Sequence, residues 1–219
     1  MISEGSTLLV ATRNRGKAKE FREAFQQIGI TVKDLYEVEG IPDIEETGET
    51  FADNAYLKAK TVADILGLPV LADDSGLCVD ALDGAPGVYS ARYAGEEAND
   101  EANNAKLLQE LKSRVEGYAQ SEQDVSEQDS VPAPELLSSA RFVCTLVLYD
   151  PQDGSKLVAE GTVEGHILRE ARGSDGFGYD PLFWLPALNR SMAELSLEEK
   201  NAISHRGQAL RRLLELIER

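Results

Sequence analysis

The N-terminal third of the sequence alternates strand-like and helix-like patterns, and this order limits the folds that the chain can adopt. Runs dominated by apolar residues at 7–12 and 68–72 predict strands, with a weaker strand around 31–36. Apolar residues recur at helical spacing over residues 17–28 and 50–66. Strands that alternate with helices form α/β folds, so we expect a mixed, twisted sheet with flanking helices.

The rest of the sequence continues this alternation. Residues 100–115 have the pattern of a helix, and β-branched and aromatic residues at 141–149 predict a strand that residues 156–163 could join as a hairpin. Near the C-terminus, Ser196 and the two glutamates after it have the form of a capping box, and residues 205–219 predict a final amphipathic helix.

One segment differs from these patterns. Residues 116–139 are acidic, rich in Ser and Gln, and include Pro132 and Pro134. A segment of this composition buries too little apolar surface to offset the entropy of ordering. We therefore predict a mobile acidic loop within a single domain spanning residues 1–219, and a solvated insertion without a catalytic part is the simplest interpretation of it.

The charge of the chain restricts its partners. The formal net charge is −17, from 39 acidic against 22 basic residues, which disfavours polymeric nucleic acid and anionic lipid surfaces. An anionic small substrate would need a local group of Lys and Arg or a divalent cation. No run approaches the ~20 apolar residues of a membrane span and no signal sequence is evident, so we expect a cytoplasmic protein with no membrane partner. Cys78 and Cys144 lie in apolar runs and are expected to pack as small buried side chains.

Two adjacent carboxylates, Asp73 and Asp74, follow the predicted strand at 68–72, and Ser75-Gly76 predicts a turn directly after them. A strand end can hold a carboxylate rigidly toward a cleft, as metal-dependent chemistry requires. A surface turn without function is the alternative interpretation of the same residues.

A polar segment joins the first predicted strand to the first predicted helix: Thr12, Arg13, Asn14, Arg15, Gly16 and Lys17. Backbone N–H groups at a helix N-terminus can bind phosphate, and Lys17 adds a full positive charge. The segment is not a Walker A loop, because Lys17 is followed by Ala18 and the first glycine of that motif is absent. An ordinary polar loop is the alternative.

Further acids precede the second predicted helix, which carries Lys58. Glu45 and Glu46, together with Asp73 and Asp74, could form an all-oxygen magnesium site, a type that uses one or two protein carboxylates and substrate phosphate oxygens. A metal ion can position an attacking water while a carboxylate takes its proton. Each glutamate could equally be an exposed surface charge.

Two C-terminal segments could contact a planar ring or further phosphates. The glycine-rich segment at 173–181 contains Phe177 and Tyr179, either of which could stack on a planar ring. Lys200, His205 and Arg206 add donors that could reach phosphates or the carbonyl edge of a base.

Six motifs occur in collinear order over nearly the whole chain: Ala11-Thr12-x-Asn14-x-Gly16-Lys17, Glu46-Thr47-Gly48-x-Thr50-Phe51-x-x-Asn54-Ala55-x-x-Lys58-Ala59, Ala72-Asp73-Asp74-Ser75-Gly76-Leu77, Gly84-Ala85-Pro86-Gly87-Val88-Tyr89-Ser90-Ala91-Arg92, Gly176-Phe177-Gly178-Tyr179-Asp180-Pro181 and Ile203-Ser204-His205-Arg206-Gly207. Together they resemble the Ham1-like nucleoside-triphosphate pyrophosphatases. The resemblance implies two lobes around a central nucleotide-binding cleft, a homodimer, and Mg²⁺-dependent hydrolysis of dITP, ITP and XTP to the monophosphate and pyrophosphate.

The same resemblance implies roles for particular residues. Asp74 would be the general base and a magnesium ligand, supported at the metal by acidic neighbours, namely Asp73 and one of Glu45 or Glu46. The phosphates would be held by Thr12, Arg13, Asn14, Arg15, Gly16, Lys17, Lys58 and Ser75. The base and the rest of the nucleotide would be bound by Phe177, Gly178, Tyr179, Asp180, Lys200, His205 and Arg206.

The sequence departs from the family pattern at two places. Arg13 stands where many members have Gly, and the acidic segment at 116–139 is longer than the usual connection. Two other functions remain open: a pyrophosphatase of broader or different base preference, and a nucleotide sensor that has lost hydrolysis. Asp74, Lys17 and Lys58 are all present, which argues against the sensor.

Overall fold

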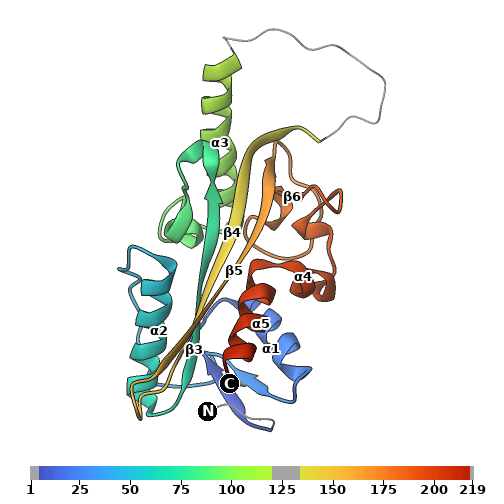
Figure 1. Ribbon diagram of the computed structural model, residues 1–219. Helices are drawn as coiled ribbons and strands as arrows, with labels where there is room; N and C mark the ends of the chain where they lie inside the picture. The colour runs from blue at the N-terminus through green and yellow to red at the C-terminus, as the bar shows by residue number, and fades with distance from the viewer. Residues whose placement is uncertain (1–4, 120–133, 218–219) are drawn as a thin grey trace. The chain divides into compact units, whose positions relative to one another are not determined.

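The computed structural model describes residues 5–119 and 134–217 (Figure 1). The strands are β1 (Thr7–Val10), β2 (Thr31–Lys33), β3 (Val70–Val79), β4 (Leu136–Tyr149), β5 (Lys156–Leu168), β6 (Phe183–Leu185) and β7 (Arg190–Ser191). The α-helices are α1 (Arg15–Gln26), α2 (Phe51–Leu66), α3 (Asp100–Ala119), α4 (Leu197–Ile203) and α5 (His205–Ile217). Short 3₁₀ helices cover Asp80–Leu82, Gly87–Arg92, Asp180–Leu182 and Met192–Glu194.

The strands form one mixed sheet in the order β2-β1-β3-β4-β5-β6-β7. β1 pairs in parallel with both β2 and β3, whereas β5 with β6 and β6 with β7 are antiparallel. β4 and β5 are neighbours, as the predicted hairpin requires. The predicted mixed α/β class is thereby confirmed.

Local signals explain where the first two long helices begin. The Asn14 side chain caps α1 by accepting a hydrogen bond from the backbone N–H of Lys17, and the Thr50 side chain caps α2 by accepting from Asp53. Gly67 ends α2 in the left-handed conformation that glycine adopts without steric cost. These caps place Lys17 in the first turn of α1 and Lys58 in the middle of α2.

β3 is longer than the sequence analysis predicted. The expected turn at Ser75-Gly76 is wrong, because the strand continues through both residues to Val79. The polar residues Asp73, Asp74 and Ser75 therefore lie within a paired strand and not at its end. This continuation determines which way each of their side chains points.

The predicted acidic loop at 116–139 is also shorter than expected at both ends, because α3 extends to Ala119 and β4 begins at Leu136. The core of the segment, residues 120–133, lies outside the described residues. Its mobility stays a prediction. No helix in the described part of the chain is long and apolar enough to cross a membrane.

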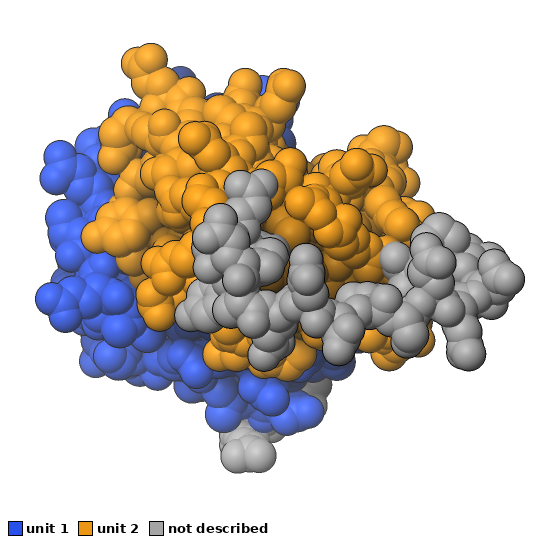
Figure 2. Space-filling model, turned by 90° about the horizontal axis from the view of Figure 1, so that it is seen from above, with its two compact units in different colours: residues 1–75, 143–163, 197–219 blue, residues 76–142, 164–196 orange. Residues whose placement is uncertain are grey.

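The chain divides into two compact units (Figure 2). Unit 1 contains residues 1–75, 143–163 and 197–219, and unit 2 contains residues 76–142 and 164–196.

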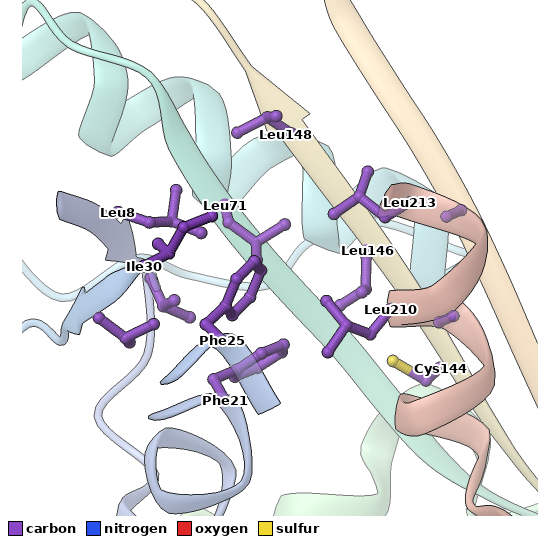
Figure 3. Packing of buried hydrophobic residues seen from close by; sticks show 14 residues of the cluster. Leu8, Phe21, Phe25, Ile30, Leu71, Cys144, Leu146, Leu148, Leu210 and Leu213 are labelled. Atoms are coloured by element: carbon purple, nitrogen blue, oxygen red, sulfur yellow. The ribbon is translucent and has the colours of Figure 1, made fainter. Parts of the chain in front are cut away.

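Unit 1 has a hydrophobic core on each face of its strands. The first cluster joins α1 and α5 to the sheet and includes Phe21, Leu71, Leu146 and Leu210 (Figure 3). The second cluster includes Ala72 and packs α2 against the opposite face. The helices α1 and α5 therefore share one face of these strands, and α2 covers the other (Figure 1).

A glycine allows α5 to approach β5 closely. A Cβ atom at Gly161 would lie 2.0 Å from the carbonyl oxygen of His205 and 2.5 Å from the backbone nitrogen of Ala209. Both distances are shorter than any van der Waals contact, so only glycine fits at this point. The contact fixes the start of α5, where Arg206 lies, against the sheet.

Candidate active site

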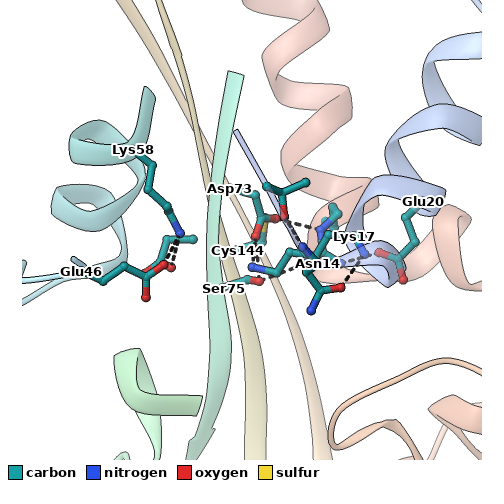
Figure 4. A network of polar contacts seen from close by, with 11 residues as sticks. Asn14, Lys17, Glu20, Glu46, Lys58, Asp73, Ser75 and Cys144 are labelled. Atoms are coloured by element: carbon teal, nitrogen blue, oxygen red, sulfur yellow. Dashed lines mark hydrogen bonds and ion pairs between the residues drawn. The ribbon is translucent and has the colours of Figure 1, made fainter. Parts of the chain in front are cut away.

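Asp73 and Asp74 project from opposite faces of β3. Side chains alternate along a strand, so Asp73 follows Leu71 toward α1 and α5, and Asp74 follows Ala72 toward α2. Figure 4 shows Lys58 and Glu46 on one side of β3, and Asp73 with Lys17 and Ser75 on the other. The two carboxylates are therefore parts of two different polar networks.

Asp73 receives hydrogen bonds from four side chains on four different elements. Lys17 of α1 forms an ion pair with its Oδ1, and the Ser75 hydroxyl donates to the same oxygen over 3.0 Å. Arg206 Nε donates to Oδ2 over 2.8 Å, and the Cys144 thiol contacts Oδ2 at 3.1 Å. Both carboxylate oxygens are thus occupied by protein donors.

These donors determine the charge of Asp73. Burial alone favours the neutral acid, but the positive charges of Arg206 and Lys17 outweigh it and hold the pKa of Asp73 well below its usual value. Burial likewise opposes the charge on Arg206, and Asp73 and Glu20 overcome it, so the pKa of the guanidinium lies well above its usual value. Asp73 and Arg206 form a charged, buried pair.

Glu20 is a second buried carboxylate in this network. Its two oxygens bind the Lys200 ammonium (2.7 Å) and Arg206 Nη1. Burial raises the pKa of Glu20, but the charges of Arg206 and Lys200 lower it further, so the carboxylate remains ionised. Arg206 Nη2 completes the network by donating to Ser75 Oγ over 2.9 Å. The guanidinium therefore joins α1, β3 and α5.

Asp74 has a different environment on the other face. Its Oδ1 accepts a hydrogen bond from Lys58 Nζ over 2.8 Å, and the same ammonium binds Glu46 Oε1 over 2.6 Å. Asp74 Oδ2 is buried and has no hydrogen-bond partner among the described residues. Burial raises the pKa of Asp74, and the charge of Lys58 offsets this only in part. Asp74 thus offers a free, weakly solvated carboxylate oxygen of raised basicity.

The four carboxylates that the sequence analysis assigned to a metal site are not brought together. Asp73 is on the opposite face of β3 and fully engaged by cations, and Glu45 is exposed. In the described ranges, no group of three or more His, Cys, Asp or Glu side chains is arranged to hold a metal ion. Only Asp74 and Glu46 share a site, and Lys58 lies between them. The two-residue period of β3 separates Asp73 from Asp74.

The predicted phosphate-binding segment leads into the first turn of α1, and hydrogen bonds between its own residues stabilise it. Thr12 Oγ1 accepts from the backbone N–H of Asn14 over 3.1 Å, and Asn14 Oδ1 accepts from that of Lys17 over 3.0 Å. Arg13 and Arg15 turn elsewhere: Arg13 binds Asp43 at 2.7 Å, and the Arg15 guanidinium lies over the exposed ring of Tyr36. Gly16 lies in the first turn of the helix. The structure thus places Lys17, and neither arginine, against the carboxylates.

The predicted base-binding residues at 177–180 belong to unit 2. The Tyr179 hydroxyl donates to the carbonyl of Ser90 over 2.9 Å, and Asp180 accepts from the backbone N–H of Phe177 over 2.9 Å. Gly178 donates to Asp100 over 2.7 Å. Tyr179 and Asp180 are buried and stabilise the segment itself, whereas Phe177 is half-buried.

The two predicted donors at the start of α5 differ in what they already bind. Arg206 uses Nε, Nη1 and Nη2 on Asp73, Glu20 and Ser75. His205 is buried, and burial together with the charge of Arg206 holds its pKa well below the usual value. The imidazole is therefore neutral, with one N–H donor and one acceptor nitrogen.

Two features of the site are not predicted from the sequence: the role of Glu20 and the polar contact of Cys144. Glu20 lies next to the apolar stripe of α1, one residue before Phe21, and an acid bordering an apolar stripe was the available signal. Cys144 was expected to fill space; it is buried, but its thiol also contacts Asp73. Nothing in the strand pattern around Cys144 indicated that contact.

Comparison with known proteins agrees with this architecture. The profile of the Ham1 family matches residues 8–216. Several relatives carry the name dITP/XTP pyrophosphatase, and two of them serve as examples. The one from Exiguobacterium sibiricum is 50% identical over 206 residues, covering 94% of each chain, and the one from Bacillus cereus is 47% identical over 211 residues, covering 96% of this chain and 94% of its own. The solved structure of a HAM1 protein from Coxiella burnetii superposes with a TM-score of 0.78 at 41% identity, covering 97% of this chain and 98% of its own.

The fold and these matches define an α/β protein of one known family. The chain belongs to the Ham1 family.

Proposed function

We propose that this protein hydrolyses dITP, ITP and XTP to the corresponding monophosphate and pyrophosphate, which removes non-standard purine nucleotides from the pool. The names of the relatives support this activity. The observation in this chain that carries the proposal is Asp74, whose buried Oδ2 lacks a partner among the described residues and whose neighbour Lys58 supplies a positive charge.

Hydrolysis needs a group that takes a proton from water. Asp74 is suited to this role because burial raises its pKa and one oxygen stays available. A carboxylate of ordinary pKa would be a weaker base near neutral pH. Asp73 cannot substitute for it, since Arg206 and Lys17 hold its pKa low and both its oxygens are engaged.

Binding the triphosphate needs positive charge that a protein of net charge −17 must concentrate locally. Lys17 in the first turn of α1 and Lys58 on α2 are the cations beside the two aspartates. The N-terminus of α1 adds backbone N–H groups and the positive end of its dipole. We assign phosphate binding to these groups.

We propose Mg²⁺ as the cofactor, held by Asp74 and Glu46. Carboxylate oxygens are the ligands that Mg²⁺ prefers, and two of them with substrate oxygens make a usual site. The position of Lys58 between these two carboxylates indicates that a cation is favourable there. When bound, the ion would neutralise charge on the phosphate oxygens. A homodimer and a cytoplasmic location are part of the same proposal, on the strength of the family resemblance.

A 6-oxo purine offers a carbonyl acceptor where adenine offers an amino donor. His205 is the proposed donor to that carbonyl, because Arg206 is already bonded to Asp73, Glu20 and Ser75. Placing a donor against adenine's amino group would leave both unpaired, and such mismatches discriminate by about 10⁴.

Pyrophosphate release from ITP, XTP, GTP and ATP, with and without Mg²⁺, tests the proposal. The expected result is metal-dependent release with kcat/KM far higher for ITP and XTP than for ATP. Equal values for ITP and ATP would remove the carbonyl readout. Binding of nucleotide without release would indicate a sensor.

A further inference from the structure

The segment that carries Glu46 is tied to α2 by a hydrogen bond between Gly48 and Asn54. The backbone N–H of Gly48 donates to Asn54 Oδ1 over 2.7 Å. Asn54 lies in the first turns of α2 and is fully buried. A short, partly buried bond of this kind gives the segment one fixed position on the helix.

Steric fit reinforces this bond. A Cβ atom at Gly48 would lie 2.7 Å from Asn54 Oδ1 and 2.6 Å from the Cβ of Asp53. Both separations are too short for any side chain, so residue 48 must be glycine to bring the backbone this close to α2. The segment therefore cannot slide along the helix without losing the contact.

The contact lies next to the reactive carboxylate. Glu46 precedes Gly48 by two residues, and Lys58 follows Asn54 by one helical turn on the same face of α2. Lys58 Nζ then joins Glu46 (2.6 Å) to Asp74 (2.8 Å). Asn54 and Lys58 thus fix the same short segment at two points, and the second point includes Asp74.

The chemistry of Asn54 points to a role beyond stability. Its Nδ2 is buried and has no hydrogen-bond partner among the described residues. A buried amide with an unsatisfied donor costs stability, which an apolar residue of similar size would avoid. What the amide provides is an acceptor for Gly48.

We propose that Asn54 is a positioning residue for hydrolysis, acting through Gly48 to hold the Glu46 carboxylate against Lys58 and Asp74. The inference rests on the proposed function. In this role Asn54 touches neither the nucleotide nor the reacting water. It determines the position of the Glu46 side chain.

A double-mutant cycle with Glu46 tests the proposal. Asn54→Ala removes the acceptor, and we expect kcat/KM for ITP to fall by about ten- to a hundredfold, the scale of a side chain misplaced by about 1 Å. In a Glu46→Ala background the same change should lower kcat/KM by less than about twofold, because the side chain that Asn54 positions is gone. Gly48→Ala disrupts the same hydrogen bond from the donor side. It should lower kcat/KM in the parent background and have little effect in the Glu46→Ala background.

Val62→Ala is the matched control. Val62 is also fully buried on α2, so its truncation destabilises the same helix without touching the Gly48 contact. We expect it to lower Tm yet leave kcat/KM within about twofold of the parent, measured at a temperature where every variant is folded.

The proposal would be overturned if Asn54→Ala lowered kcat/KM by the same factor with and without Glu46→Ala. It would also be overturned if Val62→Ala lowered kcat/KM as much as Asn54→Ala does. If Asn54→Ala does not fold, Gly48→Ala in the same cycle decides. A parent that releases no pyrophosphate from any triphosphate removes the proposed function and this inference with it, whereas an active parent with multiplying effects removes the inference alone.

Discussion

Asp73 and Asp74 are consecutive residues of β3, yet their carboxylates bind different cations on opposite faces of the strand: Asp73 binds Lys17 and Arg206, and Asp74 binds Lys58. The separation gives the two acids different chemistry. The cations hold the pKa of Asp73 low, and burial holds that of Asp74 high. One carboxylate stabilises the site, and the other is available for proton transfer.

Removal of the Asp74 charge should nearly abolish turnover. Asp74→Asn keeps the shape of the side chain but takes away the proton acceptor and a proposed metal ligand, and we expect kcat for ITP to fall by about a hundredfold or more. Pyrophosphate release at saturating ITP measures this. Asp64→Asn, which changes an exposed acid paired with Lys60 on α2, is the control and should turn over like the parent.

The pH dependence of the rate should respond to Lys58. Burial raises the pKa of Asp74, and the Lys58 charge lowers it. Lys58→Gln removes the charge that lowers the pKa of Asp74, so the acid limb of the kcat/KM profile should move to higher pH. The maximum kcat/KM should also fall. Lys60→Gln changes an exposed lysine of the same helix and should leave the limb in place. An unmoved limb in Lys58→Gln would show that Asp74 does not govern it.

Loss of the buried guanidinium of Arg206 should lower the free energy of unfolding. Arg206→Met leaves Glu20 and Asp73 buried with their main counter-charge missing, a change that costs about 3–5 kcal/mol of unfolding free energy. Urea denaturation of parent and variant gives the difference. Arg211→Met alters an exposed arginine of α5 and should cost less than about 0.5 kcal/mol.

The same two carboxylates predict how stability depends on pH. Their folded pKa values are lowered, so the stability they contribute is present above the unfolded values, about 4. It is lost as pH falls through the folded values. The stability gap between the parent and Arg206→Met should therefore narrow as pH is lowered below about 4, and a gap that widens there would contradict the assigned pKa directions.

The approach of β5 to α5 should tolerate no side chain. Gly161→Ala places a Cβ 2.0 Å from the His205 carbonyl oxygen, so the start of α5 must shift and carry Arg206 with it. We expect a lower Tm and a lower kcat/KM together. Gly154→Asn is the control: Gly154 has a left-handed backbone with open space around its Cβ position, and asparagine accepts that conformation.

Local patterns in the sequence were sufficient for most of the fold. Helical periodicity predicted α1 and α2 to within two residues at each end, because Thr50 and Gly29 lie close to where those patterns begin or stop. The motif order was sufficient to indicate the family. Lys17, Lys58 and Asp74 are predictable because their residue types match the chemistry of phosphate binding and proton transfer.

Contacts between distant segments could not be predicted in this way. The turn expected at Ser75-Gly76 rested on local turn preference, and pairing of β3 with its neighbours overrode that preference. Once the strand continued, its two-residue period separated Asp73 from Asp74. Arg206 is predicted to contact the nucleotide, but it binds Glu20, which lies 186 residues away in the sequence. No local pattern relates the two residues.

Asp73 gains its contact with Arg206 late in the synthesis of the chain. Arg206 and Asp73 are separated by 133 residues, and α5 is the last of the contacting elements to leave the ribosome. Until that helix docks, the core contains two acids without their principal counter-charge. The network around Asp73 and Glu20 is therefore complete only after α5 has been synthesised and has docked, because both acids share the guanidinium of Arg206.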